Sequence, residues 1–234
     1  GGPKDPGRAR TLLEQAVAAG VPIAKLNLGV QLHFSDNPAD QARGYGLLRD
    51  AHADERVQPL TLWPLGRAML LGRGTTRDLA GGVETLERSL KVGERRADAF
   101  FLVARAYQNG WGGKTPDLAK AYGYFSEAAR LGDERAERYV GLARLRGEGT
   151  PRDEVGALTA FRAAAELGNT DAMIHIAVML ATGEGVPADP GQARTWYRRA
   201  ADTGSAHALR GLGAMLLFGE GGAADPATGR ALVG

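Results

Sequence analysis

Histidine and cysteine are the residues from which a metal site would most readily be built, and this chain has four histidines and no cysteine. The histidines are His33, His52, His175 and His207. They are spread over three units of the repeat described below, and packed helices lie about 10 Å apart. Only His175 and His207 belong to neighbouring units, and no third ligand recurs beside them. The sequence therefore predicts no metal site.

Nucleophilic and phosphate chemistry also lack a complete motif. There is no Gly-x-Ser-x-Gly elbow, and without cysteine there is no thiol nucleophile. Gly113-Lys114-Thr115 matches the end of a phosphate-binding loop, but that loop requires a glycine where Gln108 stands and a strand where a helix is predicted. Pro116 follows where the phosphate-binding helix would begin. We therefore expect no cofactor and no catalytic residues.

The elements that would position any site are paired helices. In residues 169–204, apolar residues spaced four apart predict one helix, which ends at Gly183-Glu-Gly185 because glycine enters left-handed turns without a Cβ penalty. Asp189-Pro190 predicts the start of a second helix, with the carboxylate as cap and proline at the first position. The second helix stops at Gly204.

This helix-turn-helix pattern recurs along the chain. Closing glycines at positions 132, 168 and 204 give a period of 36 residues. The expected capping aspartates are Asp5, Asp40, Asp78, Asp117, Asp153, Asp189 and Asp225, and the turns begin at Gly72, Gly110, Gly147, Gly183 and Gly219. A period in this range predicts a solenoid, because one helix pair cannot bury its apolar face alone.

We expect one continuous array of about six repeats without a domain boundary. The segments are a half repeat at 5–20, then 21–55, 57–93, 94–132, 133–168 and 169–204, and a truncated unit at 205–234. Two early segments are irregular: Ser35 and Asn37 replace the turn glycines of one, and Pro64 disturbs the next. If Thr61 caps that helix, Pro64 falls in its first turn; otherwise the helix is kinked at Pro64.

The repeat resembles a known family. Ala-x-x-x-Leu-Gly-x-x-Tyr-x-x-Gly-x-Gly, followed by Asp, Ala, Trp, Ala-Ala and Gly at these spacings, is similar to the Sel1-like repeat, a relative of the tetratricopeptide repeat. The resemblance covers almost the whole chain and is weaker before residue 57. It implies an all-α, right-handed α-solenoid superhelix whose first helices line a concave, ligand-binding face.

A narrower resemblance involves the irregular segments. The glycine-free Phe/Asp/Pro turn, the run Leu65-Gly-Arg-Ala-Met-Leu-Leu-Gly-Arg-Gly74, the Gly93–Ala99 insertion, Phe100-Phe101 and the long turn Asn109–Lys114 occur in this order. In that order they resemble the C-terminal repeats of the alginate-export scaffold lipoproteins (AlgK type), over roughly residues 10–150. Two further repeats after residue 168 depart from that pattern. A relative serving another secreted polysaccharide fits equally well.

The resemblance to tetratricopeptide-like superhelices also implies which residues line the concave face. The partner-binding residues carried over from it are Trp63, Arg67, Phe101, Arg105, Gln108, Arg135, Arg138, Arg146, His207 and Arg210. Arginines beside aromatic rings are typical of binding hot spots, and arginine suits carboxylates. The alternative is a solvated helix face whose arginines pair with nearby acids. We expect Trp111, between two turn glycines, to be exposed, and Trp196 to pack in the core.

Composition narrows the partners. Lysine and arginine number 29 against 27 acidic residues, a net charge of +2 that does not favour nucleic acid. The sequence has no run of 18 apolar residues, so it predicts no membrane-spanning segment. No signal peptide is visible. Because the chain opens within a repeat, we expect it to be a fragment of a longer protein.

We therefore expect a non-enzymatic protein–protein interaction scaffold. The narrower resemblance implies a place in the bacterial periplasm, at the inner leaflet of the outer membrane, in an exopolysaccharide (alginate-like) secretion complex. Its partners there would be a polysaccharide-modifying enzyme and an outer-membrane export porin, with weak contact to an anionic polysaccharide. The alternative is a cytoplasmic or host-directed Sel1-like signalling adaptor for a peptide or protein. A hydrolase of cell-wall material is a third, less favoured class.

Overall fold

The computed structural model describes residues 6–233. This range contains thirteen α-helices, one short 3₁₀ helix and no strand, which confirms the all-α prediction. The helices group into two compact units, residues 1–116 (unit 1) and 117–234 (unit 2). The seven predicted repeat segments and their single continuous array stay a prediction.

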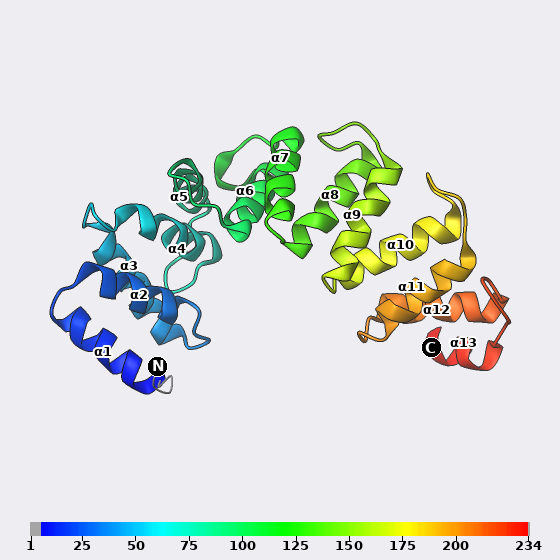
Figure 1. The fold of residues 1–234 in the computed structure, drawn as a ribbon, viewed down its shortest axis with the longest axis horizontal. Helices are drawn as coiled ribbons and strands as arrows, with labels where there is room; N and C mark the ends of the chain where they lie inside the picture. The colour runs from blue at the N-terminus through cyan, green and yellow to red at the C-terminus, as the bar shows by residue number, and fades with distance from the viewer. Residues whose placement is uncertain (1–5, 234) are drawn as a thin grey trace, which may run out of the picture. The chain divides into compact units, whose positions relative to one another are not determined.

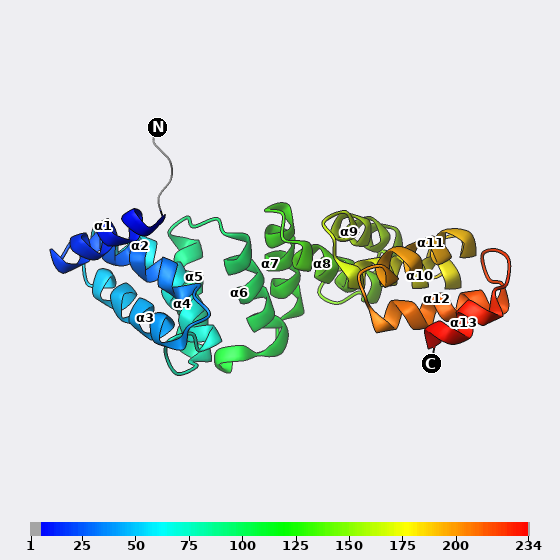
Figure 2. The ribbon, with the colours of Figure 1, turned by 90° about the horizontal axis from the view of Figure 1, so that it is seen from below.

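Unit 1 is built from helix hairpins. Its elements are α1 (Pro6–Ala18), α2 (Pro22–His33), α3 (Pro38–His52), α4 (Gln58–Leu71), α5 (Leu79–Lys91), α6 (Ala97–Asn109) and the 3₁₀ helix η1 (Trp111–Gly113). Helix α2 packs along α3 and α4 along α5, and α3 packs on α4 (Figure 1, Figure 2). Leu48 and Leu86, from the second helix of each hairpin, are fully buried.

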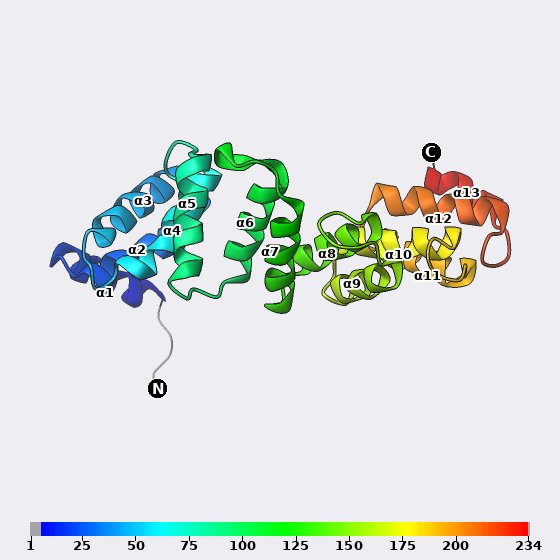
Figure 3. The ribbon, with the colours of Figure 1, turned by 90° about the horizontal axis from the view of Figure 1, so that it is seen from above.

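Unit 2 repeats the same arrangement. Its helices are α7 (Leu118–Arg130), α8 (Glu134–Arg146), α9 (Glu154–Glu166), α10 (Thr170–Thr182), α11 (Pro190–Ala201), α12 (Ala206–Phe218) and α13 (Pro226–Val233). The hairpins are α8/α9, α10/α11 and α12/α13, and each helix also packs on the next in the chain (Figure 1, Figure 3). Phe161, Ile176 and Met179 are buried in the core that the helices share, and Trp196 packs against it as predicted.

The helices that precede the turn within each repeat are called first helices, and those that follow it are called second helices. The first helices are α2, α4, α6, α8, α10 and α12, and only the turn after α2 lacks glycine. Five second helices begin at a predicted aspartate whose carboxylate accepts the backbone N–H three residues on, at 2.8–3.1 Å: Asp78, Asp117, Asp153, Asp189 and Asp225. These capping predictions are confirmed. Asp5 lies outside the described residues.

The prediction that Asp40 caps a helix is wrong. The cap of α3 is Asn37, whose side chain accepts the N–H of Ala39 at 2.9 Å, and Pro38 takes the first helical position. Because Asn-Pro is itself a strong start signal, the helix begins three residues earlier than the repeat register implies. Asp40 then lies in the first turn, where it accepts a hydrogen bond from Ser35 at 3.0 Å.

Thr61 does not cap α4 either. The helix begins at Gln58 after Val57, so Pro64 lies inside it. The Thr61 hydroxyl instead donates to the Gln58 carbonyl at 2.6 Å. Of the two alternatives, the structure therefore has Pro64 in the helix interior rather than in its first turn.

The second glycine of each turn fixes how consecutive repeats meet. Gly149 has φ +75°, and a Cβ built on it would lie 2.1 Å from the Leu118 carbonyl oxygen at the start of α7. A Cβ built on Gly221 would likewise lie 2.1 Å from the carbonyl oxygen of Pro190, at the start of α11. No side chain fits in that space, so the turn rests directly on the preceding second helix.

Candidate interaction surface

The first helices of unit 1 bring six residues into one network, which we name the Arg67 cluster. Its members are His33 and Phe34 at the end of α2, Trp63 and Arg67 of α4, and Arg96 and Asp98 at the start of α6. Arg67 lies at the centre: its Nη1 is 2.5 Å from Nε2 of His33, and its Nε is 3.5 Å from a carboxylate oxygen of Asp98. Its guanidinium also lies 4.7 Å from the Phe34 ring centre.

Trp63 is the buried platform of the cluster, with 5% of its surface exposed. Its indole Nε1 donates to both carboxylate oxygens of Asp98, at 3.0 and 3.1 Å. Phe34 stacks on its ring with 6.1 Å between centroids, and the Arg96 guanidinium lies 4.0 Å from the ring centre. Trp63 therefore holds an aromatic ring and an arginine in fixed positions.

His33 is neutral within this cluster. Its side chain is fully buried, and burial together with the charges of Arg67 and Arg73 lowers its pKa to about 4. An arginine can only donate, so Nε2 of His33 accepts from Arg67 and the ring proton is on Nδ1. Among the described residues, Nδ1 has no hydrogen-bond partner. Protonation of His33 would place a second cation against Arg67.

The outer surface of the cluster is formed by an aromatic ring and an arginine. Phe34 is 50% exposed, and the Arg96 side chain is also 50% exposed. Arg67 and Asp98 lie behind them, with side chains 18% and 30% exposed. An exposed ring and guanidinium held by buried partners have the composition of a binding hot spot.

The other predicted site residues of unit 1 lie further along α6. Phe101 is buried, and Gln108 is half-buried. The Arg105 guanidinium lies 5.7 Å from the Trp111 ring centre. The prediction that Trp111 is exposed is wrong: the ring is half-buried and packs on Leu70, Val83 and Ala106. The left-handed turn at Gly110 directs the chain back toward the hairpin core.

Lys114, part of the segment that matches the end of a phosphate-binding loop, contacts residues of its own chain. Its Nζ lies 3.1 Å from a carboxylate oxygen of Glu87 and 4.9 Å from the Tyr107 ring centre. The Tyr107 hydroxyl donates to the other Glu87 oxygen at 2.8 Å. These contacts tie the long turn after α6 to α5.

In unit 2 the predicted residues gather around His175. This imidazole stacks on the Phe161 ring at 4.8 Å, and its pKa is lowered by burial and then by the charge of Arg138. Arg138 lies 3.8 Å from Asp171. The charges of Arg146 and His207 also lower this pKa, to a smaller extent.

The other predicted site residues of unit 2 are Arg135, Arg146, His207 and Arg210, and two of these form local ion pairs. Arg135 makes two hydrogen bonds to Asp133, at 2.6 and 3.0 Å, and Arg146 lies 3.8 Å from Glu148. These two fit the alternative of a solvated face with local ion pairs. His207 and Arg210 are exposed on α12. A single groove through both units stays a prediction.

Arg96 was missed by the sequence reasoning. It precedes α6 within the two-residue insertion, so the repeat register assigns it no inward position. His33, Phe34 and Asp98 are likewise not among the predicted partner-binding residues. No group of three or more metal-ligating side chains occurs within the described part of the chain. None of its helices is long and apolar enough to cross a bilayer.

The family model described as Sel1 repeat matches residues 1–21, 97–133, 135–169, 170–205 and 206–232. The match covers more than half of the chain and omits residues 22–96. This omitted segment contains the glycine-free turn and Pro64. No curated protein matches the chain.

Solved structures with the same fold include c5321, a protective antigen present in uropathogenic Escherichia coli strains displaying an SLR fold. It is 27% identical, with a TM-score of 0.83 over 95% of this chain and 47% of that chain. This chain therefore spans about half of c5321. A Sel1 repeat protein from Oxalobacter formigenes is 22% identical, with a TM-score of 0.76 and 96% and 90% covered. YrrB, a TPR protein with an unusual peptide-binding site, is 19% identical, with a TM-score of 0.55 and 81% and 91% covered.

Proposed function

The chain belongs to the Sel1 repeat family, and we propose that it is a non-enzymatic scaffold that binds protein partners through its first helices. Sel1 and tetratricopeptide-like arrays are protein–protein interaction scaffolds, and YrrB illustrates that this fold can bind a peptide. The observation that carries the proposal is the Arg67 cluster. It presents Phe34 and Arg96 on a network that buried residues hold in place.

The chemistry of this surface favours an acidic partner segment with an apolar side chain. Because Trp63 already orders Phe34 and Arg96, these two side chains lose little additional conformational freedom when a partner contacts them. Arginine guanidinium groups match carboxylates in two-point geometry. In unit 2, exposed Arg146, His207 and Arg210 offer a second basic surface on first helices.

We further propose that the protein acts in the bacterial envelope, in the periplasm at the outer membrane. Its partners there would be a polysaccharide-modifying enzyme and an export porin of an alginate-like exopolysaccharide secretion complex. What supports this location is the resemblance of residues 10–150 to the alginate-export scaffold lipoproteins. An anionic polysaccharide is a second, weaker ligand for Arg146 and Arg210.

A pull-down from envelope extract tests the scaffold role. The baits are the wild type, Phe34→Ser/Arg96→Glu for unit 1, Arg146→Glu/Arg210→Glu for unit 2, and Val155→Ser as a matched control. Val155 is 65% exposed on the second helix α9, so its change removes exposed apolar surface away from the first helices. Circular dichroism confirms equal helicity.

We expect a protein recovered by the wild type and the Val155 variant to be lost with the unit 1 variant. Equal recovery by all four baits would exclude the first helices as the binding surface.

For the location, immunodetection in fractionated cells should find the full-length protein with the envelope. Recovery in the cytosol would instead favour the signalling adaptor.

A further inference from the structure

Helix α8 departs from the other first helices on the face that it turns toward α7 and α9. Ten residues before the glycine that ends it, α8 has Glu137, whereas the four other first helices that end at a glycine have Leu62, Phe100, Met173 and Leu209. Three residues before that glycine, α8 has Arg144, whereas the others have Met69, Tyr107, Leu180 and Leu216. Between them, Val140 keeps the apolar character of this stripe. Two charged residues of α8 therefore stand where these four helices have apolar or aromatic side chains.

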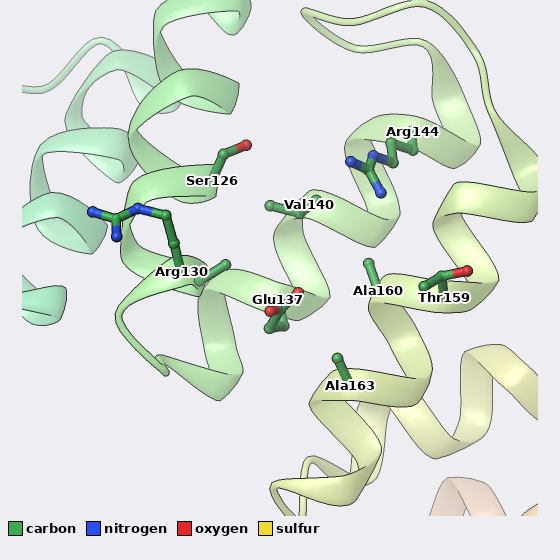
Figure 4. A pocket seen from close by; sticks show the side chains of 9 residues that line it. Ser126, Arg130, Glu137, Val140, Arg144, Thr159, Ala160 and Ala163 are labelled. Carbon is green, nitrogen blue, oxygen red and sulfur yellow. The ribbon is translucent and has the colours of Figure 1, made fainter.

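A pocket lies at this departure. Its volume is about 310 Å³, and Figure 4 shows α8 between α7 and α9, with Glu137, Val140 and Arg144 along it. The lining residues are Ser126, Ala129 and Arg130 of α7, Glu137, Val140 and Arg144 of α8, and Thr159, Ala160 and Ala163 of α9. The size is within the range of small-ligand sites, about 300–1,000 Å³. Small side chains on both walls leave the space open.

The charged groups of the pocket differ in how they are satisfied. Arg130 pairs with Glu127 at 3.0 Å, and Arg144 donates to the Tyr122 hydroxyl and the Gly156 carbonyl, each at 3.2 Å. Glu137 makes no hydrogen bond or ion pair within the described residues. Burial raises its pKa, and the charge of Arg144 acts in the opposite direction. Within the described residues, the half-buried Glu137 carboxylate is thus the charged group of the pocket that has no protein hydrogen-bond partner.

The neutral polar atoms near Glu137 also favour a ligand that carries hydrogen-bond donors and no acceptors. The Thr159 hydroxyl donates to the Val155 carbonyl at 3.0 Å, and the Ser126 hydroxyl is hydrogen-bonded to Tyr122. The Thr159 oxygen still has acceptor capacity. Ammonium and guanidinium groups carry donors without acceptors, and their alkyl stems pack well on methyl groups such as those of Val140, Ala160 and Ala163.

We propose that this pocket binds a lysine or arginine side chain of a protein partner, whose cationic group pairs with the Glu137 carboxylate. The site uses residues of α8 other than Arg135 and Arg138 and does not depend on the proposed first-helix surface. It gives the protein a second contact of opposite sign: the Arg67 cluster takes an acidic segment, and this pocket takes a basic one.

Methyl NMR with labelled alanine tests the proposal. The probe is the peptide acetyl-Ala-Arg-Ala-amide, and its control replaces arginine by citrulline, which has the same shape without the charge. We expect the arginine peptide to shift the methyls of Ala129, Ala160 and Ala163 saturably. Citrulline, or Glu137→Gln in the protein, should weaken binding about tenfold, as expected for a charge-assisted hydrogen bond.

Two further variants make the outcome specific. Glu220→Gln removes an exposed carboxylate of unit 2 in the turn after α12, which does not line the pocket, so it should bind like the wild type. Glu137→Met gives α8 the residue that α10 has at this position; it should raise the Tm and abolish binding. Equal binding of both peptides, unchanged binding by Glu137→Gln, or no shift with the arginine peptide would each overturn the proposal. A shift with inorganic phosphate alone would identify an anion site at Arg130 and Arg144 instead.

Discussion

Arg67 donates a hydrogen bond to Nε2 of His33 across 2.5 Å, from one first helix to the preceding one. The bond requires a neutral imidazole, because a protonated ring would have no acceptor to offer. Trp63 and Asp98 extend the same network to the next repeat. Three consecutive repeats are therefore joined by polar contacts at this surface, in addition to their apolar core.

The first prediction concerns pH. The pKa of His33 is about 4 in the folded protein, compared with 6.5 in the unfolded chain. Below pH 6.5 the unfolded chain takes up a proton that the folded chain does not, so stability is lost as the pH falls from 6.5 to about 4. The loss from this group is about 3 kcal/mol.

Urea unfolding at pH 7.5 and pH 4.5 measures this effect for the wild type and for His33→Gln. The pKa values of His52 and His175 are also lowered by burial, so both proteins lose stability in acid. The wild type should lose about 2–3 kcal/mol more than the variant. Parallel losses would show that His33 titrates normally.

The second prediction concerns the close contact between repeats. Gly149→Ala places a Cβ 2.1 Å from the Leu118 carbonyl oxygen and also has to adopt φ +75°. Gly147→Ala has a similar φ of +71°, but its nearest neighbour would be at 3.5 Å. We expect Gly147→Ala to cost about 1–2 kcal/mol from backbone strain alone, and Gly149→Ala clearly more. If urea unfolding gave the same loss of unfolding free energy for both variants, the structure around Gly149 would relax at little cost.

The third prediction isolates the indole hydrogen bond. Trp63→Phe keeps a ring for Phe34 and Arg96 but removes the N–H that donates to Asp98. A hydrogen bond to a charged group is worth about 1.5–3 kcal/mol, and we expect a loss near the lower value. Trp196→Phe is the matched control, since that half-buried indole makes no hydrogen bond in the described part of the chain. Similar losses in both variants would indicate a packing effect only.

The fourth prediction concerns helix capping. Asp153→Ala removes the acceptor of the Gly156 N–H at the start of α9 and should cost about 1 kcal/mol of unfolding free energy. Asp153→Asn retains a capping side chain and should be nearly neutral. A loss in the asparagine variant as large as in the alanine variant would assign the effect to charge rather than to the cap.

Part of the candidate site was visible in the sequence. The register of the repeat placed Trp63 and Arg67 on the same helix face, because side chains four residues apart share one face of a helix. The register could not show that Arg96 covers Trp63, since the insertion before α6 breaks the spacing on which the assignment relied. It also could not show that Trp111 folds back on Leu70, because a glycine turn permits several directions.

The sequence by itself determined the elements of this protein. Periodic apolar residues, capping aspartates and turn glycines act within a few residues of chain, so they specify helices and turns locally. Asp40 shows the limit of that reasoning, because a stronger start signal at Asn37 moved the helix boundary. The tertiary structure alone decided which side chains meet across repeats. Trp63 with Asp98, His33 with Arg67 and the pocket at Glu137 depend on distances between helices far apart in sequence, which no local pattern encodes.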